Sequence, residues 1–183
     1  MAAMRMTRAL SIAALLACAG VPAGAQGQAP QDDLAALKSQ LLQLRVNPYP
    51  PPRERAAQIL VAIVRRMDVT VIDQATIDEI AGLLEDNSDA VRGRMAIALG
   101  NIGPGAKHTV PALEKAFVRA KEHIATGQTS PEPRIGYRNY GLGTSADSIC
   151  FALMRLAAAI PQGCVDGRYE PSGAAAPAGA TTN

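Results

Sequence analysis

One stretch of the chain recurs at a fixed spacing, and this repeat constrains the fold more than any other feature of the sequence. A fixed period of roughly 20–50 residues is the signature of units that cannot bury an apolar face alone and must stack on their neighbours. The sequence therefore predicts a solenoid of repeated units. Five positions carry the same residue in both copies: Arg53 and Arg92, Arg55 and Arg94, Ala57 and Ala96, Leu60 and Leu99, and Ile63 and Ile102.

A weaker third copy follows at a larger separation. A third unit at this distance would need an insertion, and three matching positions can also arise by chance. The matched residues are Asp89, Val91 and Ile102, which recur at one common separation as Asp147, Ile149 and Ile160.

A resemblance to HEAT repeats is carried by residues 91–103, VRGRMAIALGNIG, which are similar to a second helix, and by residues 110–113, VPAL, which would open the next repeat. Residues 80–86, IAGLLED, are similar to the end of the first helix. The period from Arg53 to Arg92 lies at or just below the roughly 40–47 residues of such repeats. The resemblance implies an all-α fold, a short α-solenoid of about two to three helical hairpins.

The resemblance also implies a structural role for two charged residues. In HEAT repeats the Asp of the turn and the Arg just inside the second helix typically pair across stacked repeats, and here they correspond to Asp86 and Arg92. A contact of this kind sets the register between units, so we expect neither residue to be catalytic.

The remaining pattern divides the chain into segments. Two acids followed by leucines at helical spacing predict an N-terminal helix over 26–46, which caps the first repeat. Its short leucine seam is also compatible with a coiled-coil dimer. We expect the repeat domain over 47–165, with a last helix from Asp147 to Ile160. A flexible tail over 166–183 should follow, because the sequence after Cys164 loses its pattern and ends without charge or large apolar groups.

Residues 1–25 have the composition of an export signal. Two arginines precede an apolar run over 9–19, and AGA at 23–25 is a small-x-small cleavage site. We therefore expect a signal peptide cleaved near Ala25 and a periplasmic or secreted mature protein. The alternative is a lipoprotein, since LLAC at 15–18 looks like a bacterial lipobox and would leave a lipid anchor on Cys18. No other apolar run approaches the ~20 residues of a membrane-spanning helix.

The charge balance argues against nucleic acid as a partner. The chain has 18 Lys and Arg against 16 Asp and Glu. The excess comes from Arg5 and Arg8, which the predicted cleavage removes, so the mature chain is neutral. A neutral chain lacks the electrostatic footprint of a nucleic-acid binder.

Cys150 and Cys164 are the two cysteines that remain once Cys18 is removed or lipidated. In an oxidising compartment an even number of cysteines favours a structural disulfide. The bridge would close a loop of about 15 residues and contribute roughly 3 kcal/mol in the chain-entropy model. A redox-active pair is the alternative, but the spacing is not that of a dithiol motif.

An insertion over 126–145 is the one segment that the repeat does not explain. Loops longer than about 12–15 residues inside a compact domain are usually functional or disordered. Arg134, Tyr137, Arg138 and Tyr140 are residue types enriched in binding hot spots, which makes them the candidate binding residues. The alternative is that the tyrosines pin the loop to the helices beneath it.

No catalytic or metal-binding pattern is recognisable. His108 and His123 lack a second His or Cys at ligand spacing, so we interpret them as solvated surface residues and expect no metal or cofactor. The first functional hypothesis is an exported, non-catalytic module that binds or scaffolds a protein partner, because repeat solenoids present extended binding surfaces. The alternative is an enzyme or enzyme subunit whose repeats resemble those of bilin lyases and hold an apolar ligand.

Overall fold

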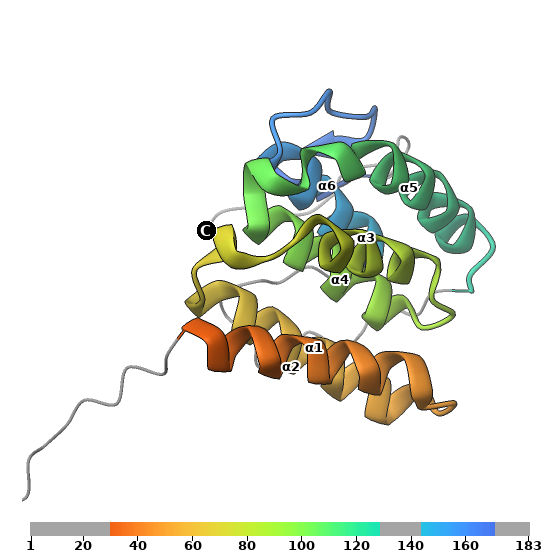
Figure 1. The fold of residues 1–183 in the computed structure, drawn as a ribbon. Helices are drawn as coiled ribbons and strands as arrows, with labels where there is room; N and C mark the ends of the chain where they lie inside the picture. The colour runs from red at the N-terminus through yellow and green to blue at the C-terminus, as the bar shows by residue number, and fades with distance from the viewer. Residues whose placement is uncertain (1–29, 129–143, 171–183) are drawn as a thin grey trace, which may run out of the picture.

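The computed structural model describes residues 30–128 and 144–170, which form a helical fold with one small β-hairpin (Figure 1). The expectation of an all-α fold is therefore confirmed. The α-helices are α1 (Pro30–Val46), α2 (Pro50–Arg66), α3 (Gln74–Gly82), α4 (Asp89–Ile102), α5 (Val110–Ala125) and α6 (Ser145–Arg155). Short 3₁₀ helices are η1 (Val69–Val71), η2 (Leu83–Glu85) and η3 (Gly103–Thr109), and the hairpin pairs β1 (Cys164–Val165) with β2 (Arg168–Tyr169).

The helices pack as three successive pairs. α1 packs against α2, α3 against α4, and α5 against α6 (Figure 1). α4 also contacts α2 on one side and α6 on the other, so α2, α4 and α6 form one row. The central place of α4 explains why most of its residues are buried. None of the described helices is long and apolar enough to cross a membrane.

The sequence repeat coincides with equivalent positions in α2 and α4. Tyr49 and Ser88, the residues that precede these helices, have the same spacing as the matched residues of the repeat. Leu60 and Leu99 therefore occupy the same turn of the two helices, and both are fully buried. The alanine and isoleucine pairs of the repeat are buried as well, which confirms these repeat positions as core.

The N-terminal helix is confirmed as α1, and its leucine seam lies inside the molecule. Leu37, Leu41 and Leu44 are at most 3% exposed, since this face of the helix packs on α2. The buried carboxylate of Asp33, in the first turn of α1, accepts two hydrogen bonds from Arg66, the last residue of α2, at 2.8 and 3.1 Å. The leucine seam is therefore packed against α2 of the same chain, and not exposed for a coiled-coil dimer.

The third copy of the repeat is out of register with the structure. The cap of α6 is Thr144, whereas the sequence echo places the counterpart of Ser88, the cap of α4, at Ala146. The expected last helix to Ile160 was also too long, because α6 ends at Arg155 and Ala157 then adopts a left-handed conformation with φ of 49°. Ile160 lies beyond the helix and is 50% exposed, so it is no counterpart of the buried Ile102.

The segment after Cys164 is folded as far as Glu170, which corrects the expected start of the flexible tail at 166. Asp166 and Gly167 have φ angles of 48° and 74° and form the turn of the hairpin. An Asp-Gly pair favours the two-residue turn in which both central residues have positive φ. This signal is present in the sequence and would have predicted the hairpin.

Candidate functional site

A polar network joins the starts of α2, α4 and α6, and its first link crosses from α2 to the turn before α4. The carboxylate of Asp86 forms an ion pair with Arg53, and the two side chains are only 6% and 12% exposed. Beside this pair, the Ser88 hydroxyl donates a hydrogen bond to Glu54 Oε1 at 2.7 Å. Breaking a buried pair leaves an uncompensated charge, so this link fixes how α2 and α4 are stacked.

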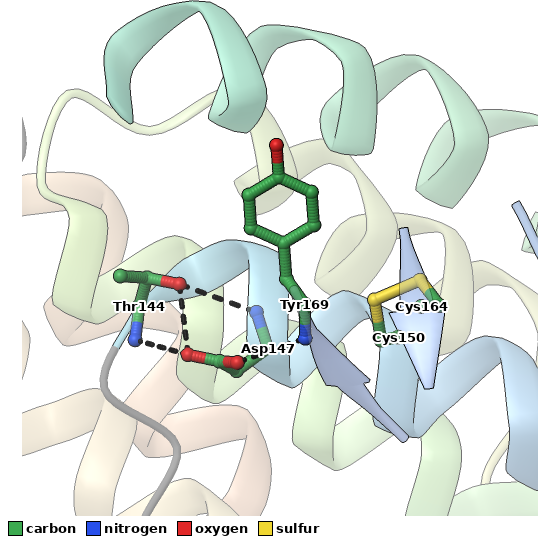
Figure 2. The surroundings of a disulfide bond; sticks show 5 residues. All are labelled: Thr144, Asp147, Cys150, Cys164 and Tyr169. Carbon is green, nitrogen blue, oxygen red and sulfur yellow. Dashed lines mark hydrogen bonds between the residues drawn. A yellow bond between two sulfur atoms is a disulfide. The ribbon is translucent and has the colours of Figure 1, made fainter. Parts of the chain in front are cut away.

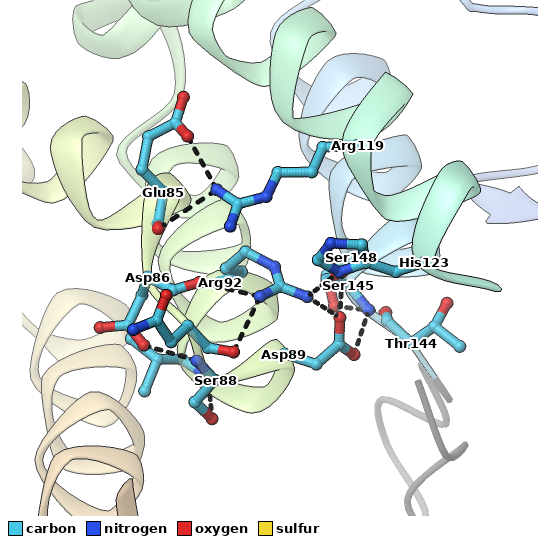
Figure 3. Close-up of polar contacts among 12 residues, drawn as sticks. Glu85, Asp86, Ser88, Asp89, Arg92, Arg119, His123, Thr144, Ser145 and Ser148 are labelled. Carbon is cyan, nitrogen blue, oxygen red and sulfur yellow. Dashed lines mark hydrogen bonds and ion pairs between the residues drawn. The ribbon is translucent and has the colours of Figure 1, made fainter. Parts of the chain in front are cut away.

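Arg92 forms the second link and is the largest fully buried side chain among the described residues, at 2% exposed. Its Nη1 donates to the main-chain oxygens of Asp86 and Asn87 at 2.8 and 3.2 Å (Figure 3). Its Nη2 donates to Asp89 Oδ1 at 2.7 Å. The guanidinium therefore holds the turn that carries Asp86 against the first turn of α4.

Asp89 forms the third link, from α4 to α6. Its Oδ2 accepts a hydrogen bond from the main-chain N–H of Ser145 at 3.0 Å, and its Oδ1 accepts one from the Ser145 hydroxyl (Figure 3). Thr144 and Asp147 then close the N-terminus of α6 with a reciprocal capping box.

Asp86 and Arg92 thus lie in one network, and Asp86 does pair with an arginine of the neighbouring unit, but that arginine is Arg53 and not Arg92. The carboxylate of Asp86 binds Arg53, which is the repeat equivalent of Arg92 in the preceding unit. Arg92 instead binds the main chain of Asp86 and the carboxylate of Asp89. The sequence pattern pointed to the turn and the helix start but gave no signal for the contributions of Asp89 and Ser145.

His123 approaches this network, which corrects its interpretation as a solvated surface residue. Its ring Nδ1 lies 3.2 Å from Arg92 Nη2. Because a guanidinium can only donate, Nδ1 must accept, and the ring proton then resides on Nε2. His108 does lie at the surface, with Nε2 2.8 Å from Asp78 Oδ1.

An exposed cluster of charges links the turn before α4 to α5. The carboxylate of Glu85 pairs with Lys115 and Arg119, each at 2.9 Å (Figure 3 shows the Arg119 contact). The hydrogen bond from Lys115, followed by the charges of both cations, lowers the pKa of Glu85 below its ordinary value. The side chain of Glu85 is half exposed, so this contact contributes little to stability.

The two stems of the predicted insertion begin and end beside the polar network. On one side the N–H of Gln128 donates to the main-chain oxygen of His123 at 2.9 Å. On the other side Thr144 caps α6 next to Ser145. The candidate binding residues Arg134, Tyr137, Arg138 and Tyr140 lie outside the described residues.

A disulfide joins Cys150 of α6 to Cys164 of the hairpin, as the cysteine count predicted (Figure 2). The two Cα atoms are 5.5 Å apart, and Cys150 is fully buried. A hydrogen bond also holds the hairpin on α6: the main-chain N–H of Tyr169 donates to Asp147 Oδ1 at 2.9 Å. The Tyr169 ring packs edge-on against Phe117 of α5, with ring centroids 5.6 Å apart. The hairpin thus packs on α6 and contacts α5 through Tyr169.

A shallow groove of about 330 Å³ lies between α1 and α3. Charged side chains line most of it, namely Lys38, Arg45, Asp73 and Glu79. Among the described residues, no three His, Cys, Asp or Glu side chains are grouped so that they would hold a metal ion. Residues 30–128 and 144–170 therefore present polar networks and helix surfaces as their candidate sites.

Comparisons with known proteins give no further identification, because no protein-family model, no curated protein and no solved structure matches the chain.

Proposed function

We propose that the chain is an exported α-solenoid of HEAT-like repeats that binds a protein partner without catalysing a reaction. The observation that carries the proposal is the stacked row of α2, α4 and α6, whose helix starts are tied together by Arg53, Asp86 and Asp89. Such a row presents a continuous surface composed of equivalent faces of successive helices. Surfaces of this kind are the usual binding sites of repeat proteins.

The charged residues of the polar network support a structural role over a catalytic one. Arg92 and Asp89 bind one another, the main chain or Ser145, so their hydrogen-bonding groups are largely used inside the molecule. A catalytic acid or base needs a proton-transfer partner in a site that substrate can reach. The buried position of Arg92, at 2% exposed, fits a residue that holds repeats in register.

The lyase-like alternative requires an apolar cavity that holds a ligand. The groove between α1 and α3 is lined mainly by charged groups, which favour water or a polar ligand. The alternative therefore gains no support from the described residues.

The test is capture of a partner from the compartment to which the protein is exported. The full-length precursor, expressed with its own leader, is crosslinked in cells, purified from the periplasmic fraction and compared with a cytosolic control. A specific, stoichiometric protein partner supports the proposal. Recovery of the crosslinked protein alone, together with turnover of a small molecule, would contradict it.

The insertion over 126–145 is tested separately. A variant with alanine in place of Arg134, Tyr137, Arg138 and Tyr140 should lose the partner and keep the melting temperature of the wild type if these residues form the recognition surface. A lower melting temperature with partner capture retained would show that they pack the loop, and would leave the helix row as the binding surface.

A further inference from the structure

Arg55 and Arg94 form the one matched pair of the repeat that neither the core nor the polar network uses. They are the sixth residues after Tyr49 and Ser88, so they occupy equivalent positions in α2 and α4. Arg55 is exposed and Arg94 is half-buried. Within 30–128 and 144–170, neither side chain has an ion pair or hydrogen bond to another residue, and Nη1 of Arg94 is buried without a partner.

The two arginines lie on the same face of the helix row. The starts of α2 and α4 are adjacent, because Arg53 and Glu54 contact the turn that precedes α4. The two helices therefore run in the same direction, and equivalent positions stack side by side. We define the arginine face as one stripe on each helix, at spacings of three and four residues: Arg55, Gln58 and Ala62 on α2, and Arg94, Ile97 and Asn101 on α4.

The arginine face has donors that the described residues leave unsatisfied. Besides Nη1 of Arg94, the side-chain Nδ2 of Asn101 is buried and without a partner, two helical turns further along the same stripe. Buried donors are costly when they are left unpaired, and a guanidinium can only donate. A ligand can reach only the exposed Arg55 and the exposed part of Arg94, and because both side chains only donate, it must supply acceptors, such as carboxylates or peptide carbonyl oxygens.

Charge on the row points to an acidic ligand. The helices α2, α4 and α6 contain seven arginines and three acids, and no lysine. Each acid is already engaged: Glu54 by Ser88, Asp89 by Arg92 and Ser145, and Asp147 by the cap of α6. Three of the arginines are also engaged, Arg53 by Asp86, Arg66 by Asp33 and Arg92 by Asp89. Arg55 and Arg94, in contrast, have no acidic partner among the described residues, and two unpaired positive charges on one face favour an acidic ligand.

We propose that the arginine face binds an extended acidic peptide of the partner protein, with one carboxylate on Arg55 and one on Arg94. This inference rests on the proposed function as an interaction module. Packed helix axes are about 8–10 Å apart, and a peptide in the extended polyproline II conformation advances about 3.1 Å per residue with three residues per turn. Carboxylates three residues apart therefore lie on the same side of the peptide at roughly 9 Å, which matches the spacing of the two guanidinium groups.

A peptide fits this face better than a nucleic acid does. The described residues of the face include no aromatic ring on which bases would stack, and single-stranded nucleic acids bind largely through such stacking. A phosphate backbone is usually bound along a groove with many positive charges, whereas this face offers only two arginines. A forked guanidinium, in contrast, binds a single carboxylate with two parallel hydrogen bonds.

The experiment measures binding of a fluorescein-labelled ten-residue peptide of Ala, Ser and Leu that carries two glutamates three residues apart. The control peptides replace both glutamates by glutamine, or place them on adjacent positions. A ten-residue oligothymidine, unlabelled, serves as competitor. The full-length protein is compared with Arg94→Gln, Arg94→Lys and Arg55→Gln, and with Arg45→Gln on α1 as a matched loss of one exposed arginine.

The expected result is binding of the spaced peptide that weakens about tenfold or more in Arg94→Gln, because a carboxylate paired with this half-buried side chain is partly shielded from water. Arg55→Gln should weaken binding about two- to fivefold, as expected for an exposed pair. Arg94→Lys should also weaken binding because it keeps the charge but loses the fork. Arg45→Gln should bind like the wild type, and unchanged melting temperatures would show that the variants fold.

Three outcomes would overturn the inference. The first is equal binding of the glutamine peptide, and the second is stronger binding of oligothymidine than of the acidic peptide. The third is capture of the native partner at wild-type level by the Arg55→Gln/Arg94→Gln double variant. This third result leaves the proposed function standing and removes only the arginine face. Failure to capture any partner with the wild-type protein, in contrast, is the failure of the proposed function itself.

Discussion

The α2–α4 junction and the α4–α6 junction join equivalent helices by different means. At the first junction, the ion pair of Arg53 with Asp86 is buried beside the apolar contacts of the repeat. At the second junction, two glycines of α4 bring the helix backbones together. A Cβ on Gly100 would lie 3.0 Å from Ala152 Cα, and one on Gly93 would lie 3.0 Å from Ser148 Oγ.

The difference arises from two positions at which the repeat is broken. Gly93 and Gly100 correspond to Glu54 and Val61, the residues at the equivalent repeat positions of α2. Larger residues at these positions would prevent the approach of α6. Gly100 lies inside α4, where close packing against α6, and not a turn, requires the absence of a side chain. The first junction should therefore be sensitive to charge, and the second to volume.

The largest effect is expected at the charged junction. Asp86→Ala removes the partner of a mostly buried Arg53 and should destabilise the protein by about 3–5 kcal/mol. Each kcal/mol lowers the melting temperature by about 2–4 °C in a domain of this size. Glu85→Ala is the matched control, since its half-exposed carboxylate should contribute about 1 kcal/mol or less. Equal urea midpoints for the two variants would contradict the first half of the comparison.

Loss of the disulfide should have the next largest effect. This bond ties α6, one of the two helices of the second junction, to the hairpin. Replacing Cys150 and Cys164 by alanine should cost about 3 kcal/mol, because the bridge no longer restricts the unfolded chain. Amide hydrogen exchange should rise in 164–170 before it rises in α2. Two free thiols, titrated in unfolded and unreduced protein from an oxidising compartment, would show that the bridge does not form.

A smaller effect tests the volume limit at the second junction. Gly100→Ala should destabilise by about 1–3 kcal/mol because its Cβ meets the backbone of α6, although alanine favours helices by about 1 kcal/mol. Gly82→Ala in α3 provides the control, because no atom lies within 4 Å of its added Cβ, and it should be neutral or stabilising. If both changes stabilise the protein, the close approach of α4 and α6 is not a constraint.

The smallest expected effect is the pH dependence of stability that arises from Asp73, the residue that caps α3 and contacts Lys38 of α1. Hydrogen bonds from the side chain and N–H of Thr76, and then one from Lys38, lower the pKa of Asp73 from 3.8 to about 2. A pKa that is lower in the folded state contributes stability that is present above the unfolded value and is lost as pH falls through the folded value. The melting temperature should therefore fall between about pH 4 and pH 2, and Asp73→Asn should fall less steeply. Parallel curves for the two proteins would exclude Asp73 as a source of this dependence.

The fold could be predicted in part because the repeat encodes it locally. Helical periodicity and the repeat match located the buried positions of α2 and α4, including Leu60 and Leu99. The third unit was misplaced in the sequence. Its helix α6 packs on Gly93 and Gly100 of α4, which have no glycine counterparts in α2. The hairpin was missed although Asp166 and Gly167 carried its signal, because the segment was judged by its lack of helical pattern.

The sequence by itself determined the helical class, the equivalence of α2 and α4, and the pairing of Cys150 with Cys164, because periodicity and cysteine count depend on neighbours along the chain. Only the tertiary structure decided which partners the buried charges take. Arg53 binds Asp86 and Arg92 binds Asp89, although both arginines occupy the same place in the repeat. The physical reason is that a buried charge is stabilised by whatever acceptor the packed helices bring within about 3 Å, and that distance is set by packing across the junction.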